Sequence, residues 1–387
     1  MNKRILLGNS LFLFCYRLTK IICFNLIYNR IIYKLFLPHK LSEIVEPGKK
    51  YMLVVCHNGG GGTVSYMKNM YEGKPDILFL RNTVSADRDY IYSIENSNKG
   101  KRIYIKPHQL KILNGRLIRI HIIAVESYMN LSKLLPWFAS HKVPITYDIH
   151  DYHCVWYETH FIHNEKYLSK EELEKSVLNY ITTRITFQEW HNIWADFFPH
   201  VQTITAFSQS SKKIFAEYYP DFEDKVIVKP HSLDYLTCGK IKKLPEKFTI
   251  GIFGVIRNAD KGSNIVKSFL EFSKDKDYQV YMNGELNPSC QVSAQNIHYM
   301  GYYDVSKLYQ VILEQGISVV LFPSICPETF SYTVSELIHV EVPVACFDLG
   351  AQAEKVSAYK YGQIIKDESN ESILEALKMA YEKGQKQ

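Results

Sequence analysis

The sequence lacks the features that mark several protein classes. Its eight cysteines are scattered, with no Cys-x-x-Cys pair and no short His/Cys cluster of zinc-site spacing, which disfavours a zinc centre. No repeat period or low-complexity tract occurs in the 387 residues, so a solenoid and a disordered chain are both disfavoured. With 46% apolar and 13% aromatic residues, the chain can instead bury two globular cores.

The body of the chain also lacks an excess of positive charge. Residues 1–50 contain nine Lys or Arg and two Asp or Glu, so this segment carries +7, whereas the whole chain carries +6. The remaining residues are therefore close to neutral. Nucleic-acid binding needs a basic groove through the folded body, so no nucleic-acid partner is expected.

The N-terminal segment lacks an uninterrupted apolar run. Four basic residues divide residues 11–37 into stretches shorter than the roughly 18 residues that a spanning helix needs. These residues are Arg17, Lys20, Arg30 and Lys34. Residues 1–48 are therefore predicted to form a basic amphipathic extension on an anionic membrane surface, with a helical hairpin packed on the first domain as the alternative. A cytoplasmic protein, peripheral at the inner face of the cell membrane, is expected.

Beyond this extension, short β-rich apolar runs alternate with helical stretches, which is typical of parallel sheets covered by helices. A polar, basic segment at residues 238–247 predicts a linker. We therefore expect an α/β fold with two Rossmann-like domains, at residues 49–237 and 248–368, that face a central cleft. A C-terminal helix is expected within residues 369–387. The predicted strands include residues 51–56, 118–125, 144–148, 248–253 and 317–322.

Two glutamates separated by seven residues follow the strand predicted at residues 317–322, in Pro-Glu-Thr-Phe-Ser-Tyr-Thr-Val-Ser-Glu. Glu328 is expected on a loop and Glu336 one or two turns into a helix. The N–H groups at the start of that helix favour a phosphate, and the deeper carboxylate can accept hydrogen bonds from ribose hydroxyls. These N–H groups belong to Thr329, Phe330, Ser331 and Tyr332. For the bare pattern, a capped helix with a solvated glutamate is the alternative.

A second candidate lies in Gly-Ile-Phe-Gly-Val-Ile-Arg-Asn-Ala-Asp-Lys-Gly at residues 251–262. Arg257 and Lys261 lie four residues apart between a predicted strand and a predicted helix. Paired cations can neutralise a leaving diphosphate without a metal. A solvated loop is the alternative interpretation.

The first domain contributes a glycine-rich loop, His-Asn-Gly-Gly-Gly-Gly-Thr at residues 57–63. Gly60, Gly61 and Gly62 allow a ligand to approach the backbone at the start of a helix. A structural turn is the alternative.

Two histidines follow predicted strands in this domain. His150 is followed by Asp151, and His231 lies in Lys-Pro-His-Ser. Either side chain of the first pair suits acid–base work, although a loop residue that forms hydrogen bonds is the simpler interpretation. No ligand spacing repeats, so no metal site is expected.

The run VVLFPSICPETFSYTVSELIHVEVPVACFDLG at residues 319–350, with His298 and Gly301 before it, resembles the donor-binding core of family-four retaining glycosyltransferases. The similarity is greatest to the branch that builds bacterial O-antigen, rhamnan and capsule chains. It covers residues 51–366, weakly in the first half. This resemblance implies the GT-B fold and sugar transfer with retention of configuration.

The resemblance also implies roles for single residues. Glu336 would bind the ribose of a nucleotide-sugar donor and Glu328 the donor sugar. Arg257 and Lys261 would neutralise the diphosphate, and His150 would lie beside the sugar. The family has glycine where this chain has Thr329 and Ser331, which narrows the space for the sugar.

The function implied is that of a hexosyl- or deoxyhexosyltransferase. The expected partners are a nucleotide-sugar donor, a glycan or lipid-linked oligosaccharide acceptor, and an anionic membrane surface, with no cofactor or metal. A sugar-nucleotide epimerase of the same fold and a non-catalytic subunit for glycan assembly are the alternatives.

Overall fold

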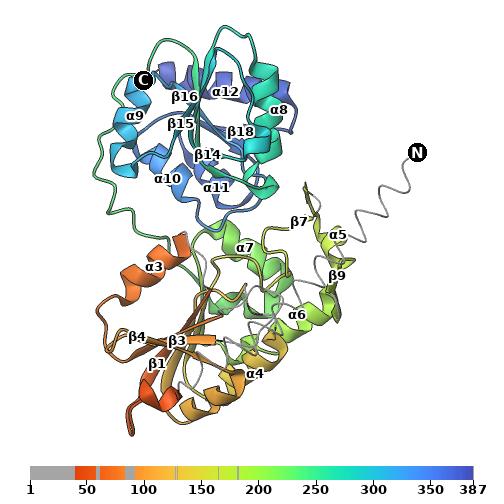
Figure 1. The fold of residues 1–387 in the computed structure, drawn as a ribbon. Helices are drawn as coiled ribbons and strands as arrows, with labels where there is room; N and C mark the ends of the chain where they lie inside the picture. The colour runs from red at the N-terminus through yellow and green to blue at the C-terminus, as the bar shows by residue number, and fades with distance from the viewer. Residues whose placement is uncertain are drawn as a thin grey trace, which may run out of the picture.

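The computed structural model of the chain describes residues 40–57, 62–82, 92–126, 128, 130–163, 165–180 and 183–386. Residues 1–39 of the expected extension lie outside this part, as do Gly60 and Gly61 of the glycine-rich loop. Two α/β domains stack on one another, with the second domain, cyan to blue, above the first, orange to green (Figure 1).

The first domain is built on a mixed sheet. Among the described residues, eight strands pair in the order β12-β11-β6-β5-β1-β2-β3-β4, and only the β2–β3 and β3–β4 pairs are antiparallel. The strands are β1 (Tyr51–Cys56), β2 (Ile77–Asn82), β3 (Tyr92–Asn96), β4 (Lys101–Ile105), β5 (Leu117–Ile122), β6 (Ile145–Asp148), β11 (Thr203–Ala206) and β12 (Val226–Val228). Two small antiparallel pairs lie outside the sheet: β7 (Ile162–His163) with β8 (Lys166–Tyr167), and β9 (Val177–Tyr180) with β10 (Thr183–Thr186).

Both faces of this sheet are covered, because β1 alternates between two apolar clusters. Leu53 and Val55 pack into the large core of the domain, whereas Val54 and Cys56 pack into a smaller cluster with Met67. The described helices of the domain are α3 (Gly62–Tyr71), α4 (Leu131–Ser140), α5 (Lys170–Glu174), α6 (Phe187–Ala195) and α7 (Gln209–Tyr218). A central strand buried on both faces is what a parallel βα arrangement requires.

The second domain has a wholly parallel sheet, in the order β15-β14-β13-β16-β17-β18. Its strands are β13 (Thr249–Ile256), β14 (Gln279–Leu286), β15 (Ile297–Gly301), β16 (Val319–Phe322), β17 (Val344–Phe347) and β18 (Gly362–Ile365). Its helices are α8 (Ser263–Ser273), α9 (Leu308–Glu314), α10 (Tyr332–His339), α11 (Gly350–Ala358) and α12 (Asn370–Gln385).

Successive side chains of β16 point to opposite faces of the sheet, and each face is covered by a different pair of helices. Val319 and Leu321 pack into the cluster that contains α8 and α12 side chains, whereas Val320 and Phe322 pack with those of α9 and α10. All the strands run in one direction, so their carboxyl ends, and the loops that follow them, lie at one edge of the sheet. That edge faces the first domain (Figure 1).

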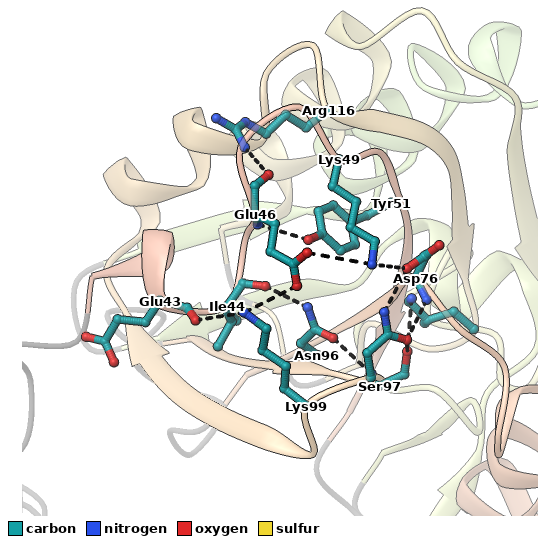
Figure 2. Close-up of polar contacts among 12 residues, drawn as sticks. Glu43, Ile44, Glu46, Lys49, Tyr51, Asp76, Asn96, Ser97, Lys99 and Arg116 are labelled. Atoms are coloured by element: carbon teal, nitrogen blue, oxygen red, sulfur yellow. Dashed lines mark hydrogen bonds and ion pairs between the residues drawn. The ribbon is translucent and has the colours of Figure 1, made fainter.

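The described end of the expected extension packs on the first domain. Leu41 and Ile44 are fully buried in its core. The Ile44 carbonyl accepts a hydrogen bond from Asn96 Nδ2 at 2.6 Å, and the Glu46 carbonyl accepts one from Arg116 Nη1 at 2.7 Å. Figure 2 shows these contacts around Tyr51 at the start of β1. No helix within the described residues is both long enough and apolar enough to cross a membrane.

Helix α7 of the first domain and helix α11 of the second contact each other where the two domains meet. The Glu354 carboxylate on α11 accepts hydrogen bonds from the backbone N–H groups of Gln209, at 3.3 Å, and Ser210, at 2.6 Å. These groups lie in the first turn of α7, where a negative charge is favourable. The contact fixes one side of the junction, next to the loops that follow β6 and β16.

Two glycines in register on β13 and β14 generate a stability prediction. Gly284 has φ +122°, and a Cβ at this position would lie 2.0 Å from the carbonyl oxygen of its partner Gly254. Because backbone must move to relieve this clash, Gly284→Ala is expected to lower the free energy of unfolding by about 2 kcal/mol or more in urea denaturation. Gly316→Ala is the control, since Gly316 also has positive φ but open space around it. Equal losses for the two variants would contradict the clash.

Candidate active site

A cavity of about 210 Å³ lies between the two domains. The first domain contributes residues at the start of α3 and after β6. The second domain contributes the loop before α8 and the loop between β16 and α10. The lining residues of the second domain are Lys261, Cys326, Pro327, Glu328, Thr329, Phe330, Ser331 and Tyr332. The structure therefore brings six of the predicted residues of this domain to one cavity.

The charged centre of the cavity is an ion pair between Lys261 and Glu328. Lys261 Nζ lies 2.8 Å from Glu328 Oε1, and their side chains are 37% and 15% exposed. Although burial would raise the pKa of Glu328, the Lys261 ammonium lowers it below its usual value. Burial likewise opposes the charge on Lys261, but Glu328 raises its pKa above the usual value. Both groups are therefore charged at neutral pH.

The loop that carries Glu328 is fixed by α11, a support that the sequence did not reveal. The backbone N–H of Glu328 donates to Gln352 Oε1 at 3.0 Å, and Gln352 Nε2 donates to the Cys326 carbonyl at 2.7 Å. Gln352 is fully buried. A Cβ at Gly350, which has φ +56°, would lie 2.6 Å from the Glu328 nitrogen. Glycine at this position therefore allows α11 to begin directly against the loop.

Helix α10 begins at the cavity, directly after a residue with an uncommon backbone conformation. Ser331 precedes the helix with φ 59° and ψ 79°, in the left-handed region that is costly for residues with a Cβ. Because the first N–H groups of a helix have no partner within it, the start of α10 can present backbone donors to the cavity that Lys261 also lines. Lys355 on α11 lies over the Phe330 ring, 3.3 Å from its centroid, and donates to the Phe330 carbonyl.

Glu336 lies on α10 and is not among the residues that line the cavity. Its side chain is buried, and its Oε1 accepts a hydrogen bond from Tyr235 Oη at 2.7 Å. Burial raises the pKa of Glu336, although the hydrogen bond from Tyr235 opposes this. Tyr235 comes from the connection between the domains. No motif singled it out in the sequence, because its contact with Glu336 joins positions that are 101 residues apart.

Arg257 is placed differently from Lys261. Its side chain is 58% exposed and pairs with Glu285 at the end of β14, where Nε lies 2.7 Å from Oε1. Arg257 Nη2 also donates to Tyr302 Oη at 3.1 Å, and the residue is not among those that line the cavity. For Arg257 to contact a diphosphate, its side chain would have to leave Glu285, so its role stays a prediction.

The two predicted histidines meet in an aromatic cluster at the cavity. His231 stacks on Phe207, with ring centroids 3.9 Å apart, and on Tyr332 of the second domain, at 5.1 Å. The His150 ring lies 4.4 Å from the same Phe207 ring. Burial lowers the pKa of His150 to about 3 and that of His231 to about 4. Both imidazoles are therefore neutral at pH 7, and neither contributes positive charge to the cavity.

Direct hydrogen bonds connect the histidine loop to the glutamate loop. Thr329 Oγ1 donates to the His150 carbonyl at 3.2 Å, and the Thr329 carbonyl accepts from Ser211 Oγ at 3.1 Å. Gly62 lies against Tyr332, because a Cβ there would come within 3.1 Å of the tyrosine ring. The His150 Nε2 atom is buried without a hydrogen-bond partner among the described residues. It lies 3.9 Å from Oδ2 of the buried Asp148 carboxylate.

Asp151 adds a partly buried carboxyl group to the cavity wall. Its Oδ1 accepts a hydrogen bond from the His153 N–H at 2.8 Å. Burial, and then the nearby Glu126 carboxylate, raise the pKa of Asp151 to about 7.

Within the described residues, no cluster of three or more His, Cys, Asp or Glu side chains is placed to bind a metal ion.

Known structures reproduce this two-domain arrangement. No protein-family model and no curated protein sequence matches the chain. Among solved structures, Anabaena HepE in complex with UDP matches with a TM-score of 0.53 at 12% identity, over 87% of this chain and 94% of HepE. The chain has the GT-B fold. Sucrose-phosphate synthase from Thermosynechococcus elongatus matches over the same shares, with a TM-score of 0.53 at 11% identity.

A glycosyltransferase from Rickettsia africae has the same GT-B fold. It matches with a TM-score of 0.51 at 14% identity, over 87% of this chain and 89% of that protein. The described sheets therefore confirm the two facing Rossmann-like domains that the sequence predicted. At these identities, the likeness concerns the fold.

The raised pKa of Asp151 generates a pH prediction. Between the ordinary aspartate pKa and about 7, the unfolded chain releases the Asp151 proton while the folded chain keeps it. Stability therefore falls as pH rises through this window. Asp151→Asn keeps an acceptor for the His153 N–H but cannot ionise. We expect its stability relative to wild type to rise by about 1–3 kcal/mol between pH 4.5 and pH 8 in urea denaturation. A difference that is independent of pH would contradict the raised pKa of Asp151.

Proposed function

We propose that the chain is a retaining glycosyltransferase that transfers a hexosyl or deoxyhexosyl group from a nucleotide-sugar donor to a glycan acceptor, without a metal ion. The observation that carries this proposal is that Lys261, Glu328 and the start of α10 meet at one interdomain cavity. A cation and a helix N-terminus favour the diphosphate of a sugar nucleotide. The adjacent carboxylate can accept hydrogen bonds from sugar hydroxyls.

The folds that resemble this chain are consistent with such a donor. The HepE structures that match it contain UDP, alone or with glucose. On this basis we place the nucleotide near α10, with the ribose at Glu336. Tyr235 Oη already donates a hydrogen bond to the Glu336 carboxylate. Ribose hydroxyls would either displace this hydrogen bond or donate to the carboxylate beside it.

The proposed reaction uses the polarity of the cavity. The bond between the anomeric carbon and the diphosphate oxygen breaks, and the acceptor hydroxyl oxygen bonds to that carbon from the same face. The departing phosphate oxygen takes the hydroxyl proton. Lys261 and the first N–H groups of α10 stabilise the charge that develops on the leaving group. Neutral His150 lines the same cavity and would lie beside the donor sugar.

The finer assignments also belong to this proposal. We propose an acceptor of the O-antigen or capsule type, either a glycan or a lipid-linked oligosaccharide. Contact with the anionic inner face of the membrane would involve residues 1–48, of which only residues 40–48 are described. A sugar-nucleotide epimerase and a non-catalytic assembly subunit are the competing functions.

Substitutions at the donor site test the residue roles. Lys261→Ala and Glu336→Ala are each expected to lower kcat/KM for the donor by about 10²–10³-fold, because each removes a charged contact to the nucleotide. The measurement is release of free nucleotide at varied donor concentration.

Matched controls are available on exposed helix faces of the same domain. Lys267 on α8 and Glu382 on α12 are exposed, so Lys267→Ala and Glu382→Ala should retain wild-type kcat/KM. If Lys261→Ala or Glu336→Ala stays within a factor of two of wild type while folded, the site assignment is wrong.

A donor panel tests the function itself. Purified protein is incubated with a set of nucleotide sugars and glycan acceptors, with and without EDTA, and free nucleotide, 2-epimer and the anomeric configuration of the product are measured. We expect acceptor-dependent nucleotide release that persists in EDTA and gives a product with the donor's configuration.

Other outcomes of the panel identify the competing functions. Formation of the 2-epimer without an acceptor would indicate an epimerase, and nucleotide binding without turnover would indicate an assembly subunit. A strict requirement for Mn²⁺ or an inverted product would contradict the proposed mechanism.

A further inference from the structure

A second, larger cavity of about 520 Å³ adjoins the donor cavity. The first domain lines it with Glu126, with Ile162 and with the four residues from Tyr157 to His160, and the second domain lines it with the loop from Asn258 to Asp260. His160 lines both cavities. The two spaces therefore meet at this imidazole, and a molecule in the larger cavity can reach the reacting end of a molecule in the smaller one.

Negative charge characterises the larger cavity. Three carboxylates line it, from Glu126, Glu158 and Asp260, and its described lining includes no lysine or arginine. Although burial would raise the pKa of Asp260, its contact with His160 lowers the pKa below the usual value, so this carboxylate is ionised at neutral pH. The donor cavity, by contrast, presents Lys261 and the start of α10. The charge thus changes sign between the two cavities.

Each of these carboxylates lies beside an imidazole. The distances are 3.8 Å from His57 Nε2 to Glu126 Oε1, 3.1 Å from His160 Nδ1 to Asp260 Oδ2, and 2.8 Å from His163 Nδ1 to Glu158 Oε1. These contacts orient the carboxylates, and the charge of Lys261, the residue after Asp260, also lowers the pKa of Asp260. Each carboxylate has two oxygens with several acceptor sites, so further hydrogen bonds remain possible.

The chemistry of this lining selects the ligand. Carboxylates accept strong hydrogen bonds from hydroxyl groups, and the Tyr157 ring together with the Ile162 side chain offers an apolar surface. A sugar ring has both hydroxyl edges and apolar faces. A phosphate, sulfate or carboxylate group in the same space would meet like charges.

We propose that this cavity is the acceptor subsite and that it takes an uncharged sugar residue. The proposal rests on the proposed function, because it assumes that the neighbouring cavity holds the donor. It specifies the class of acceptor: the residue that receives the sugar bears hydroxyl groups but no anionic group, whatever charges occur elsewhere on the glycan.

The test uses pairs of aryl glycosides that differ only at C6, in which a neutral hexoside is matched with its uronide. Binding to the protein saturated with a nucleoside diphosphate is measured by isothermal titration calorimetry and saturation-transfer NMR. We expect neutral members to bind at least about tenfold more tightly than their uronides. In the double variant Glu126→Gln, Glu158→Gln, this preference should fall to within about threefold, while nucleotide affinity is unchanged. Glu375→Gln, on the exposed face of α12, should retain the full preference.

Distinct outcomes separate this inference from the proposed function. Equal binding of hexosides and uronides to wild type, no binding of either, or a preference that persists in the double variant would overturn the acceptor subsite. Failure of every nucleoside diphosphate to bind the wild-type protein would instead overturn the proposed function.

Discussion

The ion pair between Lys261 and Glu328 is the interaction around which the interdomain cavity is organised. Each charge lies in a partly buried position, and removing one partner of such a pair leaves the other charge poorly compensated. The pair joins the loop after β13 to the loop after β16, which the parallel sheet places at one edge. Gln352 then fixes the Glu328 backbone. A dianionic ligand that approaches Lys261 would therefore enter a site that is already oriented.

The same loop also determines how the domains meet. Thr329, one residue after Glu328, donates to the His150 carbonyl and accepts from Ser211. His231 stacks on Phe207 of the first domain and on Tyr332 of the second. Because burial keeps the pKa of both imidazoles well below neutrality, His150 and His231 bring no positive charge to the donor cavity. Positive charge at the cavity thus comes from the second domain, whereas the adjoining cavity is lined by carboxylates.

Much of this arrangement follows from periodicity and motif spacing, but the partners of the site residues do not. Strand β1 occupies the predicted residues 51–56, and β16 lies within the predicted range 317–322, because both are apolar runs bounded by turn residues. The hairpin β3–β4 was not predicted. Strand β4 begins with two exposed basic residues and buries only two of its five side chains, so it lacks a continuous apolar run. The pairing of Arg257 with Glu285 depends on register between β13 and β14. Gln352 and Tyr235 act through contacts far along the chain, which no local pattern reveals.

The most direct test of the central claim is a crystal structure of the protein with the nucleoside diphosphate that binds it most tightly. The account predicts that the diphosphate lies within hydrogen-bond distance of Lys261 Nζ and of the first backbone N–H groups of α10, with the ribose hydroxyls on the Glu336 carboxylate. Density for the diphosphate elsewhere, with the Lys261–Glu328 pair and the Tyr235–Glu336 hydrogen bond unchanged, would contradict it.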